Sequence, residues 1–164
     1  MSVEVSRILH QPILGSRTLH WDDESACQAT AQVLAARPAL RDALLTLEGG
    51  LGAGKTTFVR HLLRALGVSG RIKSPTYAVL ESYELPGLTA SHLDFYRFDD
   101  PREWEDAGLR EVFAAPGLKM VEWPDHAGAL LPLPDLHLCL TIVGDTARRA
   151  EFSAYTPVGL ELLP

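Results

Sequence analysis

The chain has 164 residues, 46% of them apolar and 22% charged, which suits one domain with a buried core and excludes a disordered chain, a collagen-like repeat and a disulfide-stapled miniprotein. It carries 21 acidic and 15 basic residues, a formal charge of −6, and so lacks the positive field with which a protein binds nucleic acid by itself. We therefore expect any nucleic acid to arrive through a partner.

The sequence favours the cytoplasm as the location. No apolar run approaches the roughly 20 residues that cross a bilayer. Glu4, Arg7 and His10 interrupt the first apolar stretch, so it makes a poor signal peptide. The two cysteines, Cys27 and Cys139, stand in apolar surroundings and are expected to be reduced core thiols.

Helix-like and strand-like segments follow one another along the whole chain, which predicts one α/β domain over 1–164. Residues 1–16 are expected to be a loose lead-in. The remaining elements are predicted, in chain order, as a helix over 22–37, a strand over 43–48, a helix over 55–66, strands over 77–83 and 90–98, a short acidic helix over 100–109, and strands over 118–123, 136–143 and 150–155.

The apolar pattern of the predicted strands, and the turn residues between them, predict how the strands pair. The runs 43–48 and 118–123 are almost wholly apolar, which is typical of parallel strands buried on both faces. Pro86-Gly87 separates the strands over 77–83 and 90–98 and indicates an antiparallel pair. We expect a P-loop NTPase-like three-layer sandwich whose central sheet is mostly parallel, with antiparallel additions.

A glycine-rich segment after the first apolar strand matches the P-loop pattern, with Gly49, four residues, Gly54, Lys55 and Thr56. Its glycines let successive amides turn inward on an anion, and the following helix adds its N–H groups and dipole. Lys55 would reach the β- and γ-phosphates, and Thr56 would offer its hydroxyl to Mg²⁺. The residues predicted to bind the nucleotide are Gly50, Leu51, Gly52, Ala53, Gly54, Lys55, Thr56 and Thr57.

Acids at the ends of two predicted strands are candidates for a second Mg²⁺ anchor. Glu122 has the better apolar approach and is favoured for the metal. Asp94 is expected to hold a metal-bound water or to orient the attacking water. Thr76, in Ser-Pro-Thr, stands where P-loop enzymes often carry a switch. The sequence contains no asparagine, so the guanine-reading motif of GTPases is absent and ATP is favoured. Arg148 and Arg149 form the only adjacent arginine pair; one of them could reach the phosphates, but the favoured interpretation is a solvated turn.

Taken together, these segments resemble the TsaE (YjeE) family of small bacterial ATPases needed to make threonylcarbamoyladenosine at position 37 of tRNA. The resemblance implies that Lys55 and Thr56 hold the phosphates and Mg²⁺, that Glu122 is the second Mg²⁺ position, and that Asp94 is required for hydrolysis. It also implies that Thr76 lies in a switch-like loop and Trp123 beside the nucleotide. The segments that carry it are Gly49–Thr57, Lys73–Tyr77, His92–Arg97, Glu105–Leu109 and Val121–Pro124.

The same resemblance implies partners and a base site. Family members act in a complex with the TsaB and TsaD proteins, in which TsaD modifies the tRNA, so tRNA is met only through the complex. Thr18 and Leu19, with the turn around Arg149, would lie near the base. Gly50 departs from the family, which commonly has an acid there.

Two other functions stay open from the residues. A P-loop small-molecule kinase needs an acceptor pocket and usually a lid with several arginines, for which the chain offers only Arg148 and Arg149. A non-catalytic module would use ATP to stabilise an interface. Lys55→Ala abolishes function in every case, whereas a pure binder tolerates Glu122→Ala or Asp94→Ala.

Overall fold

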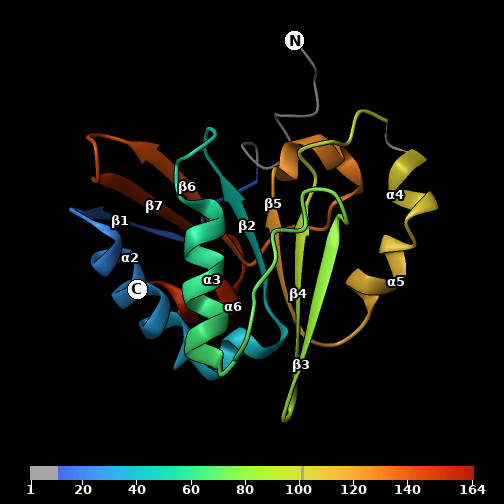
Figure 1. Cartoon of the computed structure of the whole chain (residues 1–164), viewed down its shortest axis with the longest axis horizontal. Coiled ribbons are helices and arrows are strands. Elements are labelled where there is room, and N and C mark those ends of the chain that lie inside the picture. Colours follow the sequence, from blue (N-terminus) through green and yellow to red (C-terminus); the bar gives the residue numbers. More distant parts are fainter. Residues whose placement is uncertain (1–10, 101) are drawn as a thin grey trace.

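One seven-stranded sheet forms the centre of the computed structural model, which describes residues 11–100 and 102–164 (Figure 1). The spatial order of its strands is β1-β7-β6-β2-β5-β4-β3. The strands are β1 (Gly15–Trp21), β2 (Leu44–Glu48), β3 (Leu80–Leu85), β4 (Leu88–Asp94), β5 (Leu118–Glu122), β6 (Leu136–Ile142) and β7 (Arg148–Ala154). The helices are α2 (Glu24–Ala35), α3 (Lys55–Leu66), α4 (Arg102–Asp106), α5 (Leu109–Ala114) and α6 (Pro157–Leu162), with the 3₁₀ helices η1 (Pro38–Asp42) and η2 (Pro124–Leu130).

The four central strands, β6, β2, β5 and β4, run parallel to one another, and β7, β1 and β3 add antiparallel strands at the two edges. This confirms the prediction of a P-loop NTPase-like sheet with antiparallel additions. Because the central strands are parallel, their carboxyl ends meet at one edge. Glu48, Asp94 and Glu122 are the last residues of β2, β4 and β5, so the sheet gathers three acids there.

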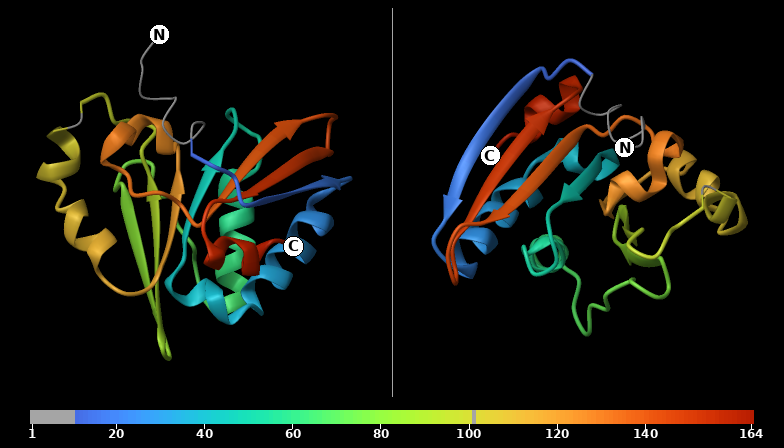
Figure 2. Two further views of the ribbon diagram at one scale, coloured as in Figure 1. Left: turned by 180° about the vertical axis from the view of Figure 1, so that it is seen from behind. Right: turned by 90° about the horizontal axis from the view of Figure 1, so that it is seen from above.

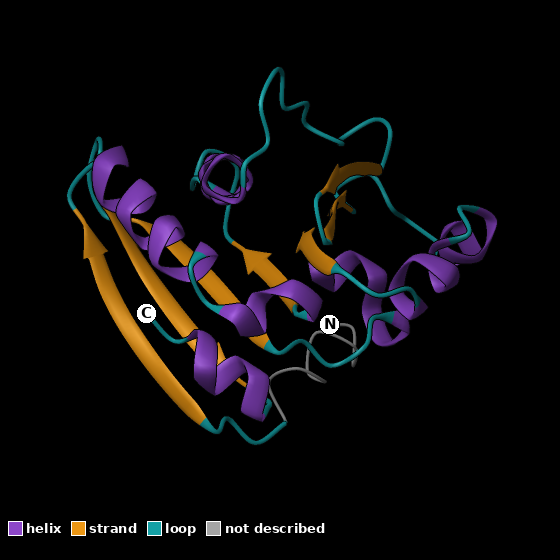
Figure 3. Cartoon of the chain, turned by 90° about the horizontal axis from the view of Figure 1, so that it is seen from below, coloured by secondary structure: helices purple, strands orange, loops and turns teal. Residues whose placement is uncertain are grey.

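Two apolar clusters cover opposite faces of the sheet. Figures 2 and 3 show α2 and α3 together on one side, and Phe58 and Leu62 of α3 pack there with Leu45. The other cluster joins Leu44 to Trp104 and to further residues of α4, α5 and η2. Successive strand residues point to opposite faces, which is why Leu44 and Leu45 belong to different clusters. A strand buried on both faces is apolar throughout, as the sequence of β2 is.

The bounds of α3 agree with the prediction, and β3 and β4 pair across Pro86-Gly87 as expected. The predicted helix over 100–109 is present as α4, but it ends at Asp106, because Gly108 takes a left-handed conformation (φ 67°) and starts α5. The strand over 90–98 ends early, because Asp94 Oδ1 accepts the N–H of Tyr96 and turns the chain. Pro101 and residues 1–10 lie outside the described residues.

Two elements escaped the sequence analysis. β1 begins at Gly15, so the end of the predicted lead-in belongs to the sheet, and β1 pairs with β7 over its whole length. α6 follows β7 and contacts β6, β7 and η1. Both cysteines are free, as expected, but only Cys27 is buried and Cys139 is half-buried. Within residues 11–100 and 102–164, no helix has the length and apolarity of a membrane span.

Gly159 is the position in α6 where the backbones approach most closely. A Cβ there would lie 1.8 Å from the Asp135 carbonyl oxygen and 3.2 Å from Ala154 Cβ. Because the first neighbour is backbone, we expect Gly159→Ala to lower the free energy of unfolding by about 1–3 kcal/mol, measured by urea denaturation. Gly50→Ala is the control: a Cβ at Gly50 meets nothing within 4 Å, and we expect a change below about 0.5 kcal/mol. Equal stability of the two variants would contradict this packing.

Candidate functional site

The P-loop connects β2 to α3 and is shaped by left-handed glycines. Gly52 (φ 77°) and Gly54 (φ 109°) adopt conformations that other residues disfavour, and Gly54 caps the amino end of α3. The N–H groups in the first turn of a helix have no acceptor within the helix. The loop leads directly into this end of α3, which is the arrangement that suits an anion at the positive end of the helix dipole.

Lys55 is folded back onto this loop. Its side chain is 5% exposed, and its Nζ donates to the carbonyls of Gly49 (2.5 Å) and Gly50 (3.0 Å). The ammonium also lies 4.3 Å from the ring centroid of Trp123. Burial lowers the pKa of Lys55, against the opposing effect of Glu122, Asp94 and Asp125. Both hydrogen-bond acceptors are neutral carbonyls, so the positive charge is available to an incoming anion.

Thr56 and Glu122, which the sequence predicted to share a metal, are in direct contact. Thr56 Oγ1 donates to Glu122 Oε1 (2.8 Å) and Oε2 (3.0 Å). Glu122 is 2% exposed, and its Oε2 also lies 2.6 Å from Nε2 of the fully buried His92. His92 was not among the predicted site residues. The signal for it was its spacing, because residues two apart on a strand, such as His92 and Asp94, point to the same face.

Asp94 lies beside Glu122, its partner in the register of β4 and β5. Its Oδ1 accepts the N–H of Tyr96 (2.9 Å), and its Oδ2 accepts the hydroxyl of Thr76 (3.2 Å). Burial raises the pKa of Asp94, and the charge of Glu122 raises it further. The structure therefore brings the three predicted catalytic residues into one hollow. It is lined by Leu51, Gly52, Gly54, Lys55, Thr56, Thr57, Thr76, Asp94, Tyr96, Glu122 and Trp123.

The loop that carries Thr76 is hydrogen-bonded to β4 and contains a strained backbone conformation at Val79. Val79, a β-branched residue, has φ 69°, a conformation that costs such residues free energy. Its N–H donates to the Pro75 carbonyl (2.6 Å), and its carbonyl accepts the N–H of Asp94 (3.0 Å). Tyr77 is 83% exposed, and the Arg97 guanidinium lies 4.1 Å from its ring centroid. Thr76 is thus fixed on Asp94 within an exposed segment.

Aromatic side chains form one wall of the hollow. Trp123 takes a left-handed conformation (φ 54°), and its ring centroid lies 5.1 Å from that of Tyr96 and 5.3 Å from that of His126. His126 Nδ1 donates to the carbonyls of Phe95 and Tyr96. The Trp123 ring therefore contacts the Lys55 ammonium on one side and packs against Tyr96 and His126.

A second hollow lies on the other side of the P-loop. The side chain of Arg148, the first residue of β7, reaches the P-loop. Its Nε donates to the Ala53 carbonyl (3.0 Å), and its Nη2 donates to the Gly52 carbonyl (3.1 Å). The interpretation of this arginine as a solvated turn was wrong. The hollow is lined by Trp21, Asp23, Glu24, Cys27, Gly52, Ala53, Gly54, Thr57, Thr146 and Arg148.

The structure does not bring Thr18 and Arg149 to either hollow. Arg149 follows Arg148 on β7 and so points to the opposite face of the sheet, where its Nε lies 3.6 Å from Glu151 Oε2. Thr18 pairs with Glu151 across β1 and β7 and shares that face.

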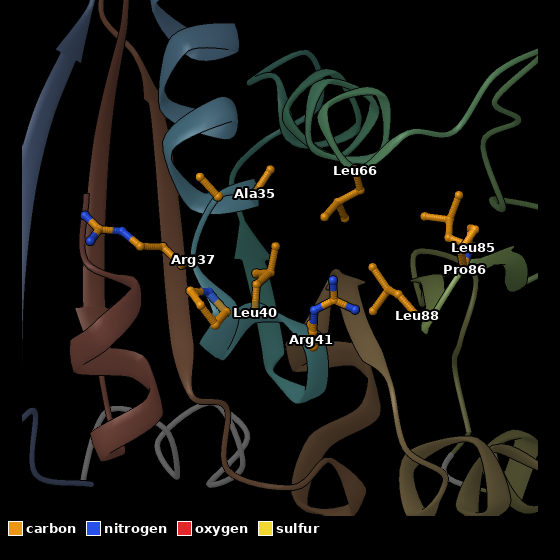
Figure 4. A pocket seen from close by; sticks show the side chains of 10 residues that line it. Ala35, Arg37, Leu40, Arg41, Leu66, Leu85, Pro86 and Leu88 are labelled. Carbon is orange, nitrogen blue, oxygen red and sulfur yellow. The ribbon is translucent and has the colours of Figure 1, made fainter.

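A third hollow, shown in Figure 4, lies at the far end of α3. Arg41 extends toward Leu66 and Leu88 there, and its Nη1 donates to the Gly87 carbonyl (2.9 Å), whereas the side chain of Arg37 points away from the leucines. Its lining holds no acid, hydroxyl or imidazole. The third hollow therefore offers no side chain for acid–base or metal chemistry.

Known proteins resemble this chain over most of its length. The family described as threonylcarbamoyl adenosine biosynthesis protein TsaE matches residues 21–150. The tRNA threonylcarbamoyladenosine biosynthesis protein TsaE of Haemophilus influenzae is 37% identical over 120 residues, 73% of this chain and 75% of that protein. The Bacillus subtilis protein of the same name is 40% identical over 111 residues, 68% of this chain and 69% of that protein. The crystal structure of Bacillus subtilis YdiB superposes with a TM-score of 0.71 at 30% identity, over 90% of this chain and 91% of that one.

Proposed function

The chain belongs to the TsaE family of tRNA threonylcarbamoyladenosine biosynthesis proteins, and on that premise we propose that it is a magnesium-dependent ATPase. The observation that carries the proposal is the convergence of Lys55, Thr56, Asp94 and Glu122 on one hollow at the carboxyl ends of β2, β4 and β5. In parallel α/β sheets, ligands bind at this edge.

The residues around the P-loop fit a triphosphate. Lys55 exchanges the Gly49 and Gly50 carbonyls for phosphate oxygens, while the N–H groups at the start of α3 bind the same phosphates. The second hollow shares Gly52, Gly54 and Thr57 with the first, so it would take the sugar and base. Trp21 and Arg148 line it in place of the expected Thr18 and Arg149.

Thr56 and Glu122 would hold the Mg²⁺. In the described part of the chain, no three His, Cys, Asp or Glu side chains come together as a metal site. A hydroxyl and one carboxylate suit Mg²⁺, which commonly takes one or two carboxylates and completes its shell with phosphate oxygens and water. When bound, the metal would neutralise charge on the phosphates.

We propose that Asp94 orients the attacking water. Thr76 and the Tyr96 N–H hold its carboxylate in the hollow, close to Glu122 and Thr56. The Asp94 carboxylate accepts a hydrogen bond from the water and so orients the water oxygen toward the γ-phosphorus. The water oxygen forms a bond to the γ-phosphorus while the bond from that phosphorus to the bridging oxygen breaks and releases ADP, and both protons of the water leave with the inorganic phosphate.

We further propose that ATP binding and hydrolysis support assembly and reset of a complex with the TsaB and TsaD proteins, through which alone the chain meets tRNA. The formal charge of −6 fits a protein that does not bind tRNA by itself. Hydrolysis is expected to be slow until partners complete the site.

The test measures ATP hydrolysis by the purified protein, alone and with TsaB and TsaD, followed by nucleoside analysis of the tRNA. We expect the partners to stimulate hydrolysis, and repeated modification to require Thr56 and Glu122. If the partners change nothing while an added nucleoside or sugar consumes ATP, the protein is a small-molecule kinase and the proposal fails.

A further inference from the structure

His92 is a fully buried polar residue that contacts the predicted metal ligand and has no place in the mechanism above. Its Nε2 lies 2.6 Å from Glu122 Oε2. Its Nδ1 is buried and has no hydrogen-bond partner among the described residues. Two of its neighbours are apolar and fully buried: Ala90, on the same face of β4, and Met120, opposite His92 in β5; the half-buried Glu81 stands opposite it in β3. An imidazole that is fully buried with one nitrogen unpartnered needs an explanation.

The contact with Glu122 supplies one. A metal-binding carboxylate is ionised and can only accept hydrogen bonds, so the ring proton must stand on Nε2 and point at Oε2. The buried Nδ1, on the other side of the ring, makes no hydrogen bond to the described residues. The imidazole is thus buried with a hydrogen bond at Nε2, to the carboxylate, and none at Nδ1.

Glutamate needs such an anchor more than aspartate does. The acid at this place in P-loop NTPases is typically aspartate. The extra methylene of Glu122 adds a rotatable bond, which must be fixed before the carboxylate can meet Thr56. His92 lies on the neighbouring strand β4 and contacts Oε2 of Glu122. Thr56, in α3, contacts the other oxygen: its Oγ1 lies 2.8 Å from Oε1. The two contacts fix the direction of the carboxylate.

We propose that His92 is a positioning residue for the metal: its Nε2–H holds Glu122 in the orientation that binds Mg²⁺ with the nucleotide. This rests on the proposed function, because it concerns the same metal. His92 touches neither phosphate nor metal and acts only through Glu122. Loss of a hydrogen bond of this kind typically weakens metal affinity by about 10–100-fold.

The experiment measures how much Mg²⁺ strengthens nucleotide binding. Isothermal titration gives the Kd of a non-hydrolysable ATP analogue in EDTA and in Mg²⁺, and the ratio of the two is the magnesium effect. Two matched variants each place an amide at position 92. In His92→Gln the amide nitrogen reaches the place of Nε2, whereas in His92→Asn it reaches only that of Nδ1. Both are polar and neutral, so their burial is comparable.

We expect His92→Asn to reduce the magnesium effect about tenfold while the Kd in EDTA stays within twofold, and His92→Gln to restore it. In a Glu122→Ala background, His92→Asn is expected to change nothing further, because His92 acts through that carboxylate. If His92→Asn does not fold, His92→Leu takes its place as the variant without a donor.

Several results would overturn the proposal. An unchanged magnesium effect in His92→Asn would do so, as would equal losses in His92→Asn and His92→Gln, or a loss of affinity that is the same in EDTA. These outcomes are distinct from failure of the proposed function. If the unmodified protein binds no nucleotide, or binds it without any effect of Mg²⁺, both proposals fall; otherwise only the role of His92 does.

Discussion

Lys55→Ala is expected to weaken ATP binding about 100-fold or more, with a comparable loss of hydrolysis at limiting ATP. Lys55 is a buried cation whose two acceptors are backbone carbonyls, which a phosphate would replace in the proposed function. Truncating one partner of a buried, hydrogen-bonded charge pair commonly costs about 2–5 kcal/mol, and about 2.7 kcal/mol corresponds to a factor of 100. Isothermal titration in Mg²⁺ measures the change.

Lys119→Ala is the matched control for this variant. Lys119 is also a buried lysine, burial also lowers its pKa, and its Nζ also donates to a backbone carbonyl, that of Ala115. It lies near the amino end of β5, away from the P-loop. We expect its ATP affinity to stay within twofold of the unmodified protein. A similar loss of affinity in both variants would mean that a buried lysine matters here only for folding.

Asp94→Asn is expected to slow hydrolysis by about 10²–10⁴-fold while ATP affinity in Mg²⁺ changes little. The amide keeps the acceptor for the Tyr96 N–H but loses the charge that orients the water. Steady-state hydrolysis and isothermal titration separate the two effects. Asp125→Asn is the control, because Asp125 is an exposed acid that acts on Lys55 only through its charge. A parallel loss in Asp125→Asn would indicate a general charge effect.

The same substitution is expected to stabilise the nucleotide-free protein at neutral pH. Burial raises the pKa of Asp94, so the folded state disfavours its ionised form more than the unfolded state does. This cost is full above the raised pKa, falls as the pH drops through it, and is gone below the usual range of an aspartate. The amide that replaces the carboxylate carries no charge, so in EDTA the Asp94→Asn variant should melt higher than the unmodified protein at pH 7, with the difference shrinking toward acid. A lower melting temperature at pH 7 would contradict a raised pKa.

The amino-acid sequence by itself determined the features that depend on neighbours along the chain. Glycines at Gly52 and Gly54 supply the left-handed turns of the P-loop, and the apolar run of β2 and the amphipathic α3 follow from composition and period. Pro86-Gly87 marks the turn between β3 and β4. Thr56 could be predicted from the P-loop pattern, and Asp94 and Glu122 because an acid that ends a buried parallel strand lies at the edge of the sheet where the P-loop begins.

The tertiary structure alone decided which side of the sheet a residue faces. Arg148, not Arg149, lies on the P-loop because the pairing of β7 with β6 and β1 sets the register, and neighbouring residues of a strand point to opposite faces. The edge strand β1 exists for the same reason, since its polar sequence becomes a strand only against β7. His92 meets Glu122 through the register of β4 with β5. Pairing between distant segments sets these contacts, and no local pattern in the sequence carries that pairing.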